Sequence, residues 1–421
     1  MAQQRPLAAF ASRDFRLIWI GNLVSLTGTE MSRAAVAWQV YQVTGDPLAL
    51  GMIGAARLIP MVLLALGAGV LADAFDRRKL LIGAQVALLI CSLTLAVSTS
   101  LDVVTIWLIY AITALAGAAS TIGLPARQAL IPSLVPREHL AGALSLNITA
   151  MHLATVLGPT VSGLIIANSG VGPVYWLDAA SFIVLISTLL LMSPRPLEVQ
   201  QRDVSLRAVV DGLQFIRRNK LIWSSMLLDF LATFFSAATT LIPLFAEEIL
   251  QVGPEGMGLL FAAPSAGAVI ASIVISWSGA GRRQGPLLLW SVVIFGLSTI
   301  VFGLSNWFWL SLLLLAINGA ADTVSMVVRG TIRNLETPDT MRGRMVAINM
   351  LFFAGGPQLG EIEAGVAARL LGGPLSVALG GVACVAMTGL LAVATPELRR
   401  YTDGTRHAAS PDQAVCTPSS P

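Results

Sequence analysis

The feature that most constrains this chain is a series of twelve long apolar runs, separated by short polar or Gly/Pro-containing breaks. A helix that crosses a bilayer needs about 20 predominantly apolar residues. The 421 residues are 55% hydrophobic and only 12% charged, whereas a soluble domain carries about 25% charged residues. The runs are continuous rather than alternating, which argues against membrane-spanning strands. We therefore expect an all-α membrane protein with twelve transmembrane helices, over residues 15–43, 48–74, 80–99, 103–126, 142–167, 173–193, 220–246, 256–278, 285–304, 307–328, 345–371 and 374–395.

The lysines and arginines give a test of this count. An even number of spans places both termini on one side, and the cytoplasmic side of a membrane protein is enriched in bases. Of the 26 lysines and arginines, 23 fall in the terminal segments or in the connections on the side of the termini, and the exceptions are Arg33, Arg57 and Arg369. We therefore expect a multi-pass protein of the bacterial inner (cytoplasmic) membrane, with both termini in the cytoplasm.

The longest connection, residues 194–219, divides the spans into two groups of six. Its second part places four apolar residues on one helical stripe with the charged residues elsewhere, which is typical of a helix lying on the membrane surface. The expected organisation is a cytoplasmic N-terminal segment (1–14), an N-terminal six-helix bundle (15–193), a cytoplasmic linker with an amphipathic helix (194–219), a C-terminal six-helix bundle (220–395) and a disordered cytoplasmic tail (396–421).

The two groups of spans show a weak internal repeat. Residues 127–147 align with residues 329–349 at a constant offset, with an arginine, a proline and an asparagine identical between them. Each segment follows the fourth span of its half. Parallel six-span repeats related by an axis along the membrane normal are a transporter architecture.

The connection between the second and third spans, GVLADAFDRRK at 69–79, concentrates charge between two apolar runs. Arg77 and Arg78 fit an orientation signal on the cytoplasmic side. Asp73 is harder to explain, because an acid at the C-terminal end of a helix faces the negative end of the helix dipole. Gly69, one turn earlier, would let a neighbouring helix approach closely.

In this twelve-span context the loop resembles the signature of the major facilitator superfamily, with Gly69, Asp73, Arg77 and Arg78 in the expected places. The resemblance covers residues 10–396. It extends to the branch of enterobactin exporters and transmembrane secretion effectors through FRLIWIGNLVSLTG, ARLIPM, ARQALIPSLVPREHLAGALSLN, YWLDAASF and PQLGEIEAG. It implies two pseudo-symmetric six-helix bundles and a contact in which Asp73 caps the eleventh span when the cytoplasmic side is closed. The alternative is an acid that is merely solvated in a loop.

The stretch GPTVSG, residues 158–163, resembles the span-5 signature of antiporters in the same superfamily. Gly158, Pro159 and Gly163 occupy matching positions, whereas Ser162 replaces the second glycine of the signature. The resemblance implies exchange of one solute for another, and the serine is a departure from the pattern.

The first half carries charges at bilayer depth, where an unpaired charge costs several kcal/mol. Glu30 and Arg33 are three residues apart on one helical face. Arg57 lies as far after the turn near Gly45 as Arg33 lies before it, so the three side chains should meet near the middle of the membrane. One interpretation is that Glu30 takes up a proton or pairs with substrate; the other is a closed ion-pair group that only fixes packing.

The second half has its own candidates in Asp229, Asp322 and Glu361, in the seventh, tenth and eleventh spans. Glu361 follows GGPQLG, whose glycines and proline we expect to break the helix and open backbone groups to a cavity. We expect Glu361 rather than Glu363 to face that cavity. Asp322 has no obvious partner, and a bond to Asn318 is the alternative to a functional role.

Three further acids, Asp178, Glu247 and Glu248, lie near the outer ends of spans and are expected to be surface residues. The sequence contains no phosphate-binding GxxxxGK[ST] motif and no zinc-type Cys/His spacing. We expect no cofactor, no metal site and no enzymatic activity. The expected partners are a small-molecule substrate, protons and the lipid bilayer, without nucleic acid, and we expect the monomer to be functional.

The sequence therefore predicts a secondary active transporter that exports a small organic molecule, siderophore-like or drug-like, by alternating access in exchange for protons. Glu30 is the first candidate for the carboxylate that binds the proton, and Glu361 is the second. An importer or facilitator of the same fold is the alternative, and a polytopic receptor is a more distant one.

Overall fold

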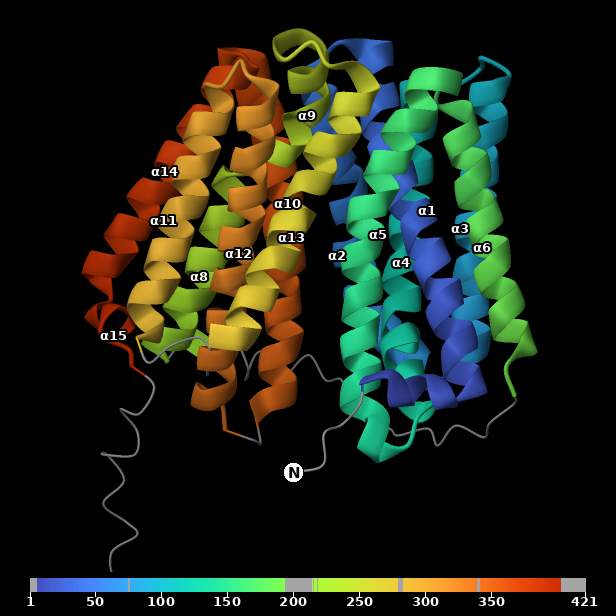
Figure 1. Ribbon diagram of the computed structural model, residues 1–421, viewed down its shortest axis with the longest axis horizontal. Helices are drawn as coiled ribbons and strands as arrows, with labels where there is room; N and C mark the ends of the chain where they lie inside the picture. Colours follow the sequence, from blue (N-terminus) through green and yellow to red (C-terminus); the bar gives the residue numbers. More distant parts are fainter. Residues whose placement is uncertain are drawn as a thin grey trace, which may run out of the picture.

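The computed structural model describes residues 6–74, 76–193, 214, 216–217, 219–278, 283–338 and 341–402. Within these residues the chain consists of helices joined by short connections and contains no strand (Figure 1). The long helices of the first half are α1 (Arg13–Thr44), α2 (Pro47–Ala74), α3 (Arg77–Ser100), α4 (Ile106–Ser133), α5 (Leu140–Ser169) and α6 (Gly172–Leu191). Those of the second half are α8 (Lys220–Phe235), α10 (Gly253–Ser278), α11 (Gln284–Gly303), α12 (Phe308–Glu336), α13 (Arg342–Leu371) and α14 (Gly373–Ala394).

Ten helical segments of the described chain are long and apolar enough to cross a membrane. The two other long helices are α1, with 32 residues, and α13, with 30 residues. Both contain the intramembrane charges predicted above, including Glu30 and Glu361, and these lower their hydropathy. The twelve predicted runs coincide with the ten apolar segments together with α1 and α13, so the predicted all-α membrane fold is confirmed.

Each half packs its helices in the same pattern. In the first half α1 contacts α5 and α6, α3 contacts α4 and α6, and α2 contacts α4. In the second half α8 contacts α13 and α14, α11 contacts α12 and α14, and α10 contacts α12. The second set follows from the first when α1–α6 are matched in chain order to α8 and α10–α14. The two halves are therefore structural repeats, as the alignment at constant offset predicted.

The halves join through two equivalent pairs of helices, α5 with α10 and α2 with α13. Glycines permit the close approach. A β-carbon added at Gly51 of α2 would lie 2.8 Å from the carbonyl oxygen of Glu361, and one added at Gly365 of α13 would lie 2.8 Å from the Cα of Gly51. Gly163 of α5 and Gly258 of α10 face each other in the same way.

Among the described residues, the apolar core that the two halves share lies at one end. A large apolar core draws residues from both halves, among them Tyr41, Leu50, Ile53, Leu241 and Phe245. The other large cores lie within a single half, one around Phe15 and Leu81 and the other around Leu228 and Leu288. Figure 1 shows the ribbons of the two halves meeting at the top and separated at the bottom, where the N-terminal segment lies.

The unwound part of the membrane region lies in the seventh span, not in the eleventh as predicted. After α8 ends at Phe235, the chain continues through η3 (Ala238–Leu241), α9 (Ile242–Leu244) and a π-helical turn, η4 (Phe245–Ile249). In contrast, α13 runs unbroken through GGPQLG. Its glycines serve packing instead, because a β-carbon at Gly360 would lie 2.6 Å from the carbonyl oxygen of Phe234 in α8.

The predicted terminal and linker segments are only partly described. The amphipathic helix predicted within 194–219 lies outside the described residues, apart from four positions near its end. Disorder from residue 396 is a wrong prediction for the first part of the tail. There α15 (Pro396–Arg399) buries Leu398 completely, and the backbone N–H of Gly285 donates to the carbonyl of Tyr401 at 3.0 Å. Residues 403–421 lie outside the description.

Candidate functional site

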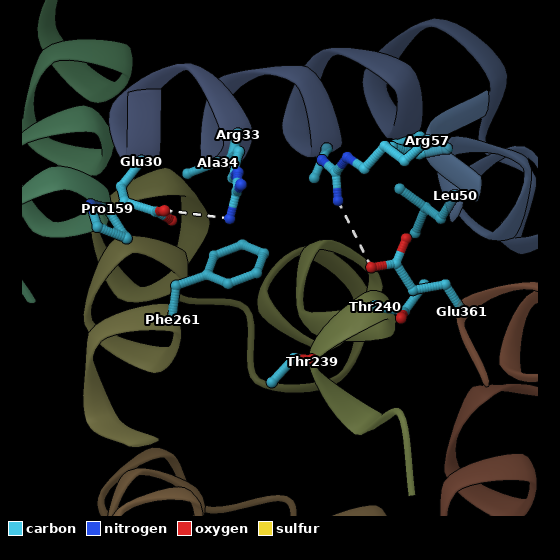
Figure 2. Close-up of a pocket in the computed structure, with 12 residues that line it drawn as sticks. Glu30, Arg33, Ala34, Leu50, Arg57, Pro159, Thr239, Thr240, Phe261 and Glu361 are labelled. Carbon is cyan, nitrogen blue, oxygen red and sulfur yellow. Dashed lines mark hydrogen bonds and ion pairs between the residues drawn. The ribbon is translucent and has the colours of Figure 1, made fainter. Parts of the chain in front are cut away.

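A cavity of about 160 Å³ lies between the halves, where α1, α2 and α5 face the broken seventh span, α10 and α13. We call it the central cavity. Its apolar wall includes Leu50, Ile53 and Phe261. Its polar lining consists of Glu30, Arg33, Arg57, Thr239, Thr240 and Glu361 (Figure 2). The unwound segment of the seventh span supplies the two threonines.

Two ion pairs face each other across the central cavity (Figure 2). Arg33 Nη1 lies 3.1 Å from Glu30 Oε1 within α1, and Arg57 Nη1 lies 3.5 Å from Glu361 Oε1 between α2 and α13. The second pair therefore connects the two halves. The Arg33 side chain is 58% exposed, whereas those of Glu30, Arg57 and Glu361 are between 18% and 25% exposed. Arg33 is the charge most available to a ligand.

The structure brings Glu30, Arg33 and Arg57 together, as the sequence predicted, and adds Glu361 from the other half. Glu363 is not among the residues that line the cavity. Each glutamate lies over a glycine of a neighbouring helix. A β-carbon at Gly158 would lie 2.6 Å from the Cβ of Glu30, and one at Gly54 would lie 2.6 Å from the Cβ of Glu361.

The span-5 motif positions the first of these glutamates. Gly158 leaves room for Glu30, Pro159 lines the central cavity, and Gly163 lies against α10. Ser162, which departs from the family pattern, is fully buried and donates a hydrogen bond to the carbonyl of Met31 at 3.0 Å. The serine therefore attaches α5 to α1 within one residue of Glu30.

The loop between α2 and α3 is described only in part. The side chains of Gly69 and Asp73, and those of the first residues of α13, lie outside the described side chains, so the predicted contact of Asp73 is not described. Arg77 begins α3, and Arg78 Nη2 donates to the carbonyl of Leu190 at 3.0 Å. Asp76 is the N-cap of α3 and accepts from the backbone N–H of Arg78 at 2.8 Å. An aspartate just before a helix is the usual sign of such a cap.

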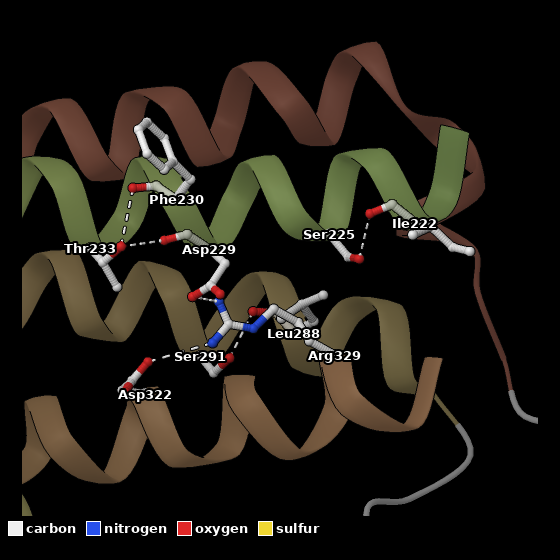
Figure 3. A network of polar contacts seen from close by, with 9 residues as sticks. All are labelled: Ile222, Ser225, Asp229, Phe230, Thr233, Leu288, Ser291, Asp322 and Arg329. Atoms are coloured by element: carbon white, nitrogen blue, oxygen red, sulfur yellow. Dashed lines mark hydrogen bonds and ion pairs between the residues drawn. The ribbon is translucent and has the colours of Figure 1, made fainter. Parts of the chain in front are cut away.

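Asp229 and Asp322 belong to a separate network, centred on Arg329 (Figure 3). Arg329 pairs with Asp229 and lies 3.7 Å from Asp322. Arg329 is 2% exposed and Asp229 is 5% exposed, and neither lines the central cavity. Arg329, one of the 23 bases counted outside the spans, lies within α12, which continues past the predicted end of its span and buries this side chain.

The alternative bond from Asn318 to Asp322 is absent among the described contacts. Asn318 Nδ2 instead donates to the carbonyl of Phe295 at 3.2 Å and to Thr299 Oγ1 at 3.0 Å. Asn318 therefore connects α12 to α11, and the ion-pair partner of Asp322 is Arg329.

The arginines that broke the charge rule all have carboxylate partners. Arg33 and Arg57 form the pairs of the central cavity. Arg369, near the end of α13, lies 3.6 Å from Asp46 of the first half. Close by, the Tyr41 hydroxyl donates to Glu248, which also joins the halves. These two contacts close the end of the molecule far from the termini.

Among the three acids predicted at the surface, Glu247 and Glu248 are exposed as expected. Asp178 is not, because it is 2% exposed and accepts a hydrogen bond from the Ser92 hydroxyl. The sequence predicted a surface position for Asp178 because this residue lies near the outer end of its span. That position does not show which neighbouring helix the side chain faces. In the described residues no group of three or more His, Cys, Asp or Glu side chains is arranged to hold a metal ion.

Comparison with known proteins agrees with this architecture. The family model described as transmembrane secretion effector matches residues 4–416. The enterobactin exporters EntS of Shigella boydii serotype 18 and Escherichia coli O81 are each 27% identical over 391 residues, which cover 92% of this chain and 93% of the relative.

Solved structures show the same fold at low identity. The nucleoside transporter NupG has a TM-score of 0.71 at 14% identity, covering 92% of this chain and 100% of NupG. A bacterial homologue of the iron transporter ferroportin has a TM-score of 0.68 at 15% identity, covering 92% of this chain and 98% of that one. This multi-pass membrane protein, a transporter and not an enzyme, therefore belongs to the transmembrane secretion effector family of the major facilitator superfamily.

Proposed function

We propose that this protein exports a small organic molecule across the bacterial inner membrane in exchange for protons. The observation that carries the proposal is the central cavity, in which two glutamate–arginine pairs lie between two repeats. Charged side chains inside a membrane are costly and rare, and where they occur they pair with one another and mark substrate or ion pathways. The relatives are named enterobactin exporters, which supports export and a siderophore-like substrate.

The way in which the halves pack supports alternating access. They share a core at the end far from the termini and have separate cores at the other end. The distribution of lysine and arginine supports cytoplasmic termini. On this orientation the conformation is closed to the outside, and transport consists of the two repeats rocking about the central cavity.

The cavity also supplies a physical reason for exchange. An ionised carboxylate accepts hydrogen bonds from hydroxyl or ammonium groups of a substrate, and a protonated one has lost that charge-assisted acceptor. Substrate and proton then exclude each other at the same oxygen atoms. Glu30 is the first candidate, because its partner Arg33 is the most exposed charge of the cavity. Glu361 is the second, and its pair with Arg57 also holds the halves together.

The lining favours an amphipathic substrate. Leu50, Ile53 and Phe261 offer apolar and aromatic surface, while Thr239 and Thr240 add hydroxyl groups beside the charges. A siderophore-like molecule with aromatic rings and hydroxyl groups fits this chemistry, and so does an amphipathic drug.

The experiment is proton-driven uptake of candidate substrates by everted membrane vesicles. E30Q should abolish proton-driven accumulation while the protein remains folded, because glutamine keeps the shape of the side chain but cannot ionise. E138Q is the matched control, since the Glu138 side chain is 75% exposed and lies outside the cavity. Full proton-driven transport by E30Q would remove Glu30 from the mechanism. Accumulation only in right-side-out vesicles would identify an importer.

A further inference from the structure

A second cavity, of about 200 Å³, lies among α1, α2, α3, α4 and α6 of the N-terminal half, with Gln358 of α13 as its lining residue from the other half. We call it the N-half cavity. Arg33 and Arg57 line both this cavity and the central cavity. Its polar lining includes hydroxyl groups from three helices, among them Ser32, Ser92 and Thr121. The proposed function makes no use of it.

The carboxylate of Asp178 lines the N-half cavity and is 2% exposed. Its Oδ2 accepts from the hydroxyl of Ser92 on α3. Its Oδ1 accepts no hydrogen bond of standard geometry among the described residues, although the Ser32 hydroxyl lies nearby. A β-carbon at Gly28 would lie 2.9 Å from Oδ1, so the carboxylate lies against α1.

Asp178 differs in its partners from the acids of the central cavity and from Asp229. Glu30, Glu361 and Asp229 each pair with an arginine. Asp178 has no arginine, lysine or histidine within ion-pair distance in the described part of the chain. An ionised carboxylate without a cation is costly at this depth, whereas a neutral carboxylic acid needs only hydrogen bonds.

We propose that Asp178 is a proton-carrying residue of this transporter, neutral in the conformation closed at the outer end. Its proton leaves to cavity water when the O–H bond breaks, and the Ser92 hydroxyl continues to donate to the carboxylate that remains. Arg33 and Arg57 line both cavities, so the negative charge of ionised Asp178 attracts them. The charge competes with Glu30 and Glu361 for the same arginines, which connects proton release to the substrate-binding cavity. This link to transport rests on the proposed function, whereas the protonation of Asp178 does not.

Few other groups near Asp178 change charge. Tyr175 lies on α6 and donates to Gln39 at 2.8 Å, and Cys91 lines the same cavity from α3. Both are neutral near pH 7. Arg33 on α1 and Arg57 on α2 are permanently positive, and α4 contributes hydroxyl groups but no charge among its described lining residues. Apart from Asp178, the two arginines are therefore the charged side chains among the described residues that line the N-half cavity.

The test is pH-dependent infrared difference spectroscopy of the purified full-length protein in lipid, without substrate. The wild type should show a carbonyl band of a protonated carboxyl group that disappears as the pH rises. D178N should lack this band and E30Q should retain it. S92A keeps the carboxyl group but loses its hydrogen-bond donor, so the pH at which the band disappears should shift.

A wild-type spectrum without such a band, or an identical band in D178N, would overturn the proposal. Thermal unfolding shows whether D178N folds. If D178N does not fold, the S92A variant provides the test, and a band that disappears in S92A at the same pH as in the wild type overturns the assignment. Transport assays distinguish the proposed exchange of substrate for protons from the proposed protonation of Asp178. Loss of proton coupling in D178N with retained substrate binding supports both. A band assigned to Asp178 together with proton-independent transport refutes the proposed exchange and leaves the protonation standing.

Discussion

Replacing Gly365 by alanine should open the end of the molecule at which the two halves meet. The added β-carbon would lie 2.8 Å from the Cα of Gly51 and 2.9 Å from the carbonyl oxygen of Pro47. Relaxed carbon–carbon contacts are about 3.5–4.0 Å, so α2 and α13 must separate by roughly 0.7 Å or more. Overpacking of this kind costs about 1–3 kcal/mol. Because the contact exists only when this end is closed, the cost falls on the closed state.

At about 1.4 kcal/mol for each factor of ten, the ratio of closed to open molecules should fall by about 5-fold to 140-fold. Spin labels at Val43 and Leu370, which are 53% and 77% exposed, report the distance between the halves by pulsed electron resonance in a background without native cysteines. G365A should enrich the longer distances relative to the parent.

The matched control is G389A, because a β-carbon at Gly389 of α14 meets no atom within 4 Å. Both substitutions add the same methyl group and the same helix propensity. If G365A and G389A give the same distance distribution as the parent, the helices do not hold this end closed by glycine contact.

Three further predictions concern single contacts. R329A should lower the free energy of unfolding by about 3–5 kcal/mol, because it leaves Asp229 buried without a cation, and denaturant unfolding in detergent that shows less than about 1 kcal/mol would contradict this account. D76A should destabilise the first turn of α3 by about 1 kcal/mol, seen as faster amide exchange there and not elsewhere. D46N should weaken the closed outer end by only about 0.2–1 kcal/mol, because its partner Arg369 is half exposed; a shift in label distances as large as that of G365A would show that this ion pair, and not helix packing, holds the end.

The helices could be predicted from the sequence because the membrane imposes a length and a composition on each of them. The predicted first span, 15–43, differs from α1 by two residues at its start and one at its end. The break in the seventh span was missed although Pro243 lies in it, because the segment contains no glycine between Lys220 and Gly253 and single prolines lie inside the unbroken helices α5 and α10. Conversely, the glycines and proline of GGPQLG predicted a break in α13. The helix is unbroken there, and these glycines instead allow close packing against α8.

Part of the candidate site could be predicted because charges in an apolar run are conspicuous and the hairpin between α1 and α2 fixes their relative depth. That reasoning brought Glu30, Arg33 and Arg57 together. It could not find the partner of Arg57, since Glu361 lies 304 residues away in the chain. Nor could it show that Asp178 faces Ser92, because depth along a helix does not determine the face that a neighbour covers.

The central claim is that substrate and protons cross the membrane in opposite directions through the central cavity. The most direct measurement is simultaneous recording of substrate and proton movement by the purified protein in sealed vesicles that contain no other protein. Substrate added on the cytoplasmic face should enter the vesicles while the medium acidifies, and E30Q should show no substrate-dependent acidification. Substrate entry that makes the medium alkaline, or that leaves its pH unchanged, would contradict the account.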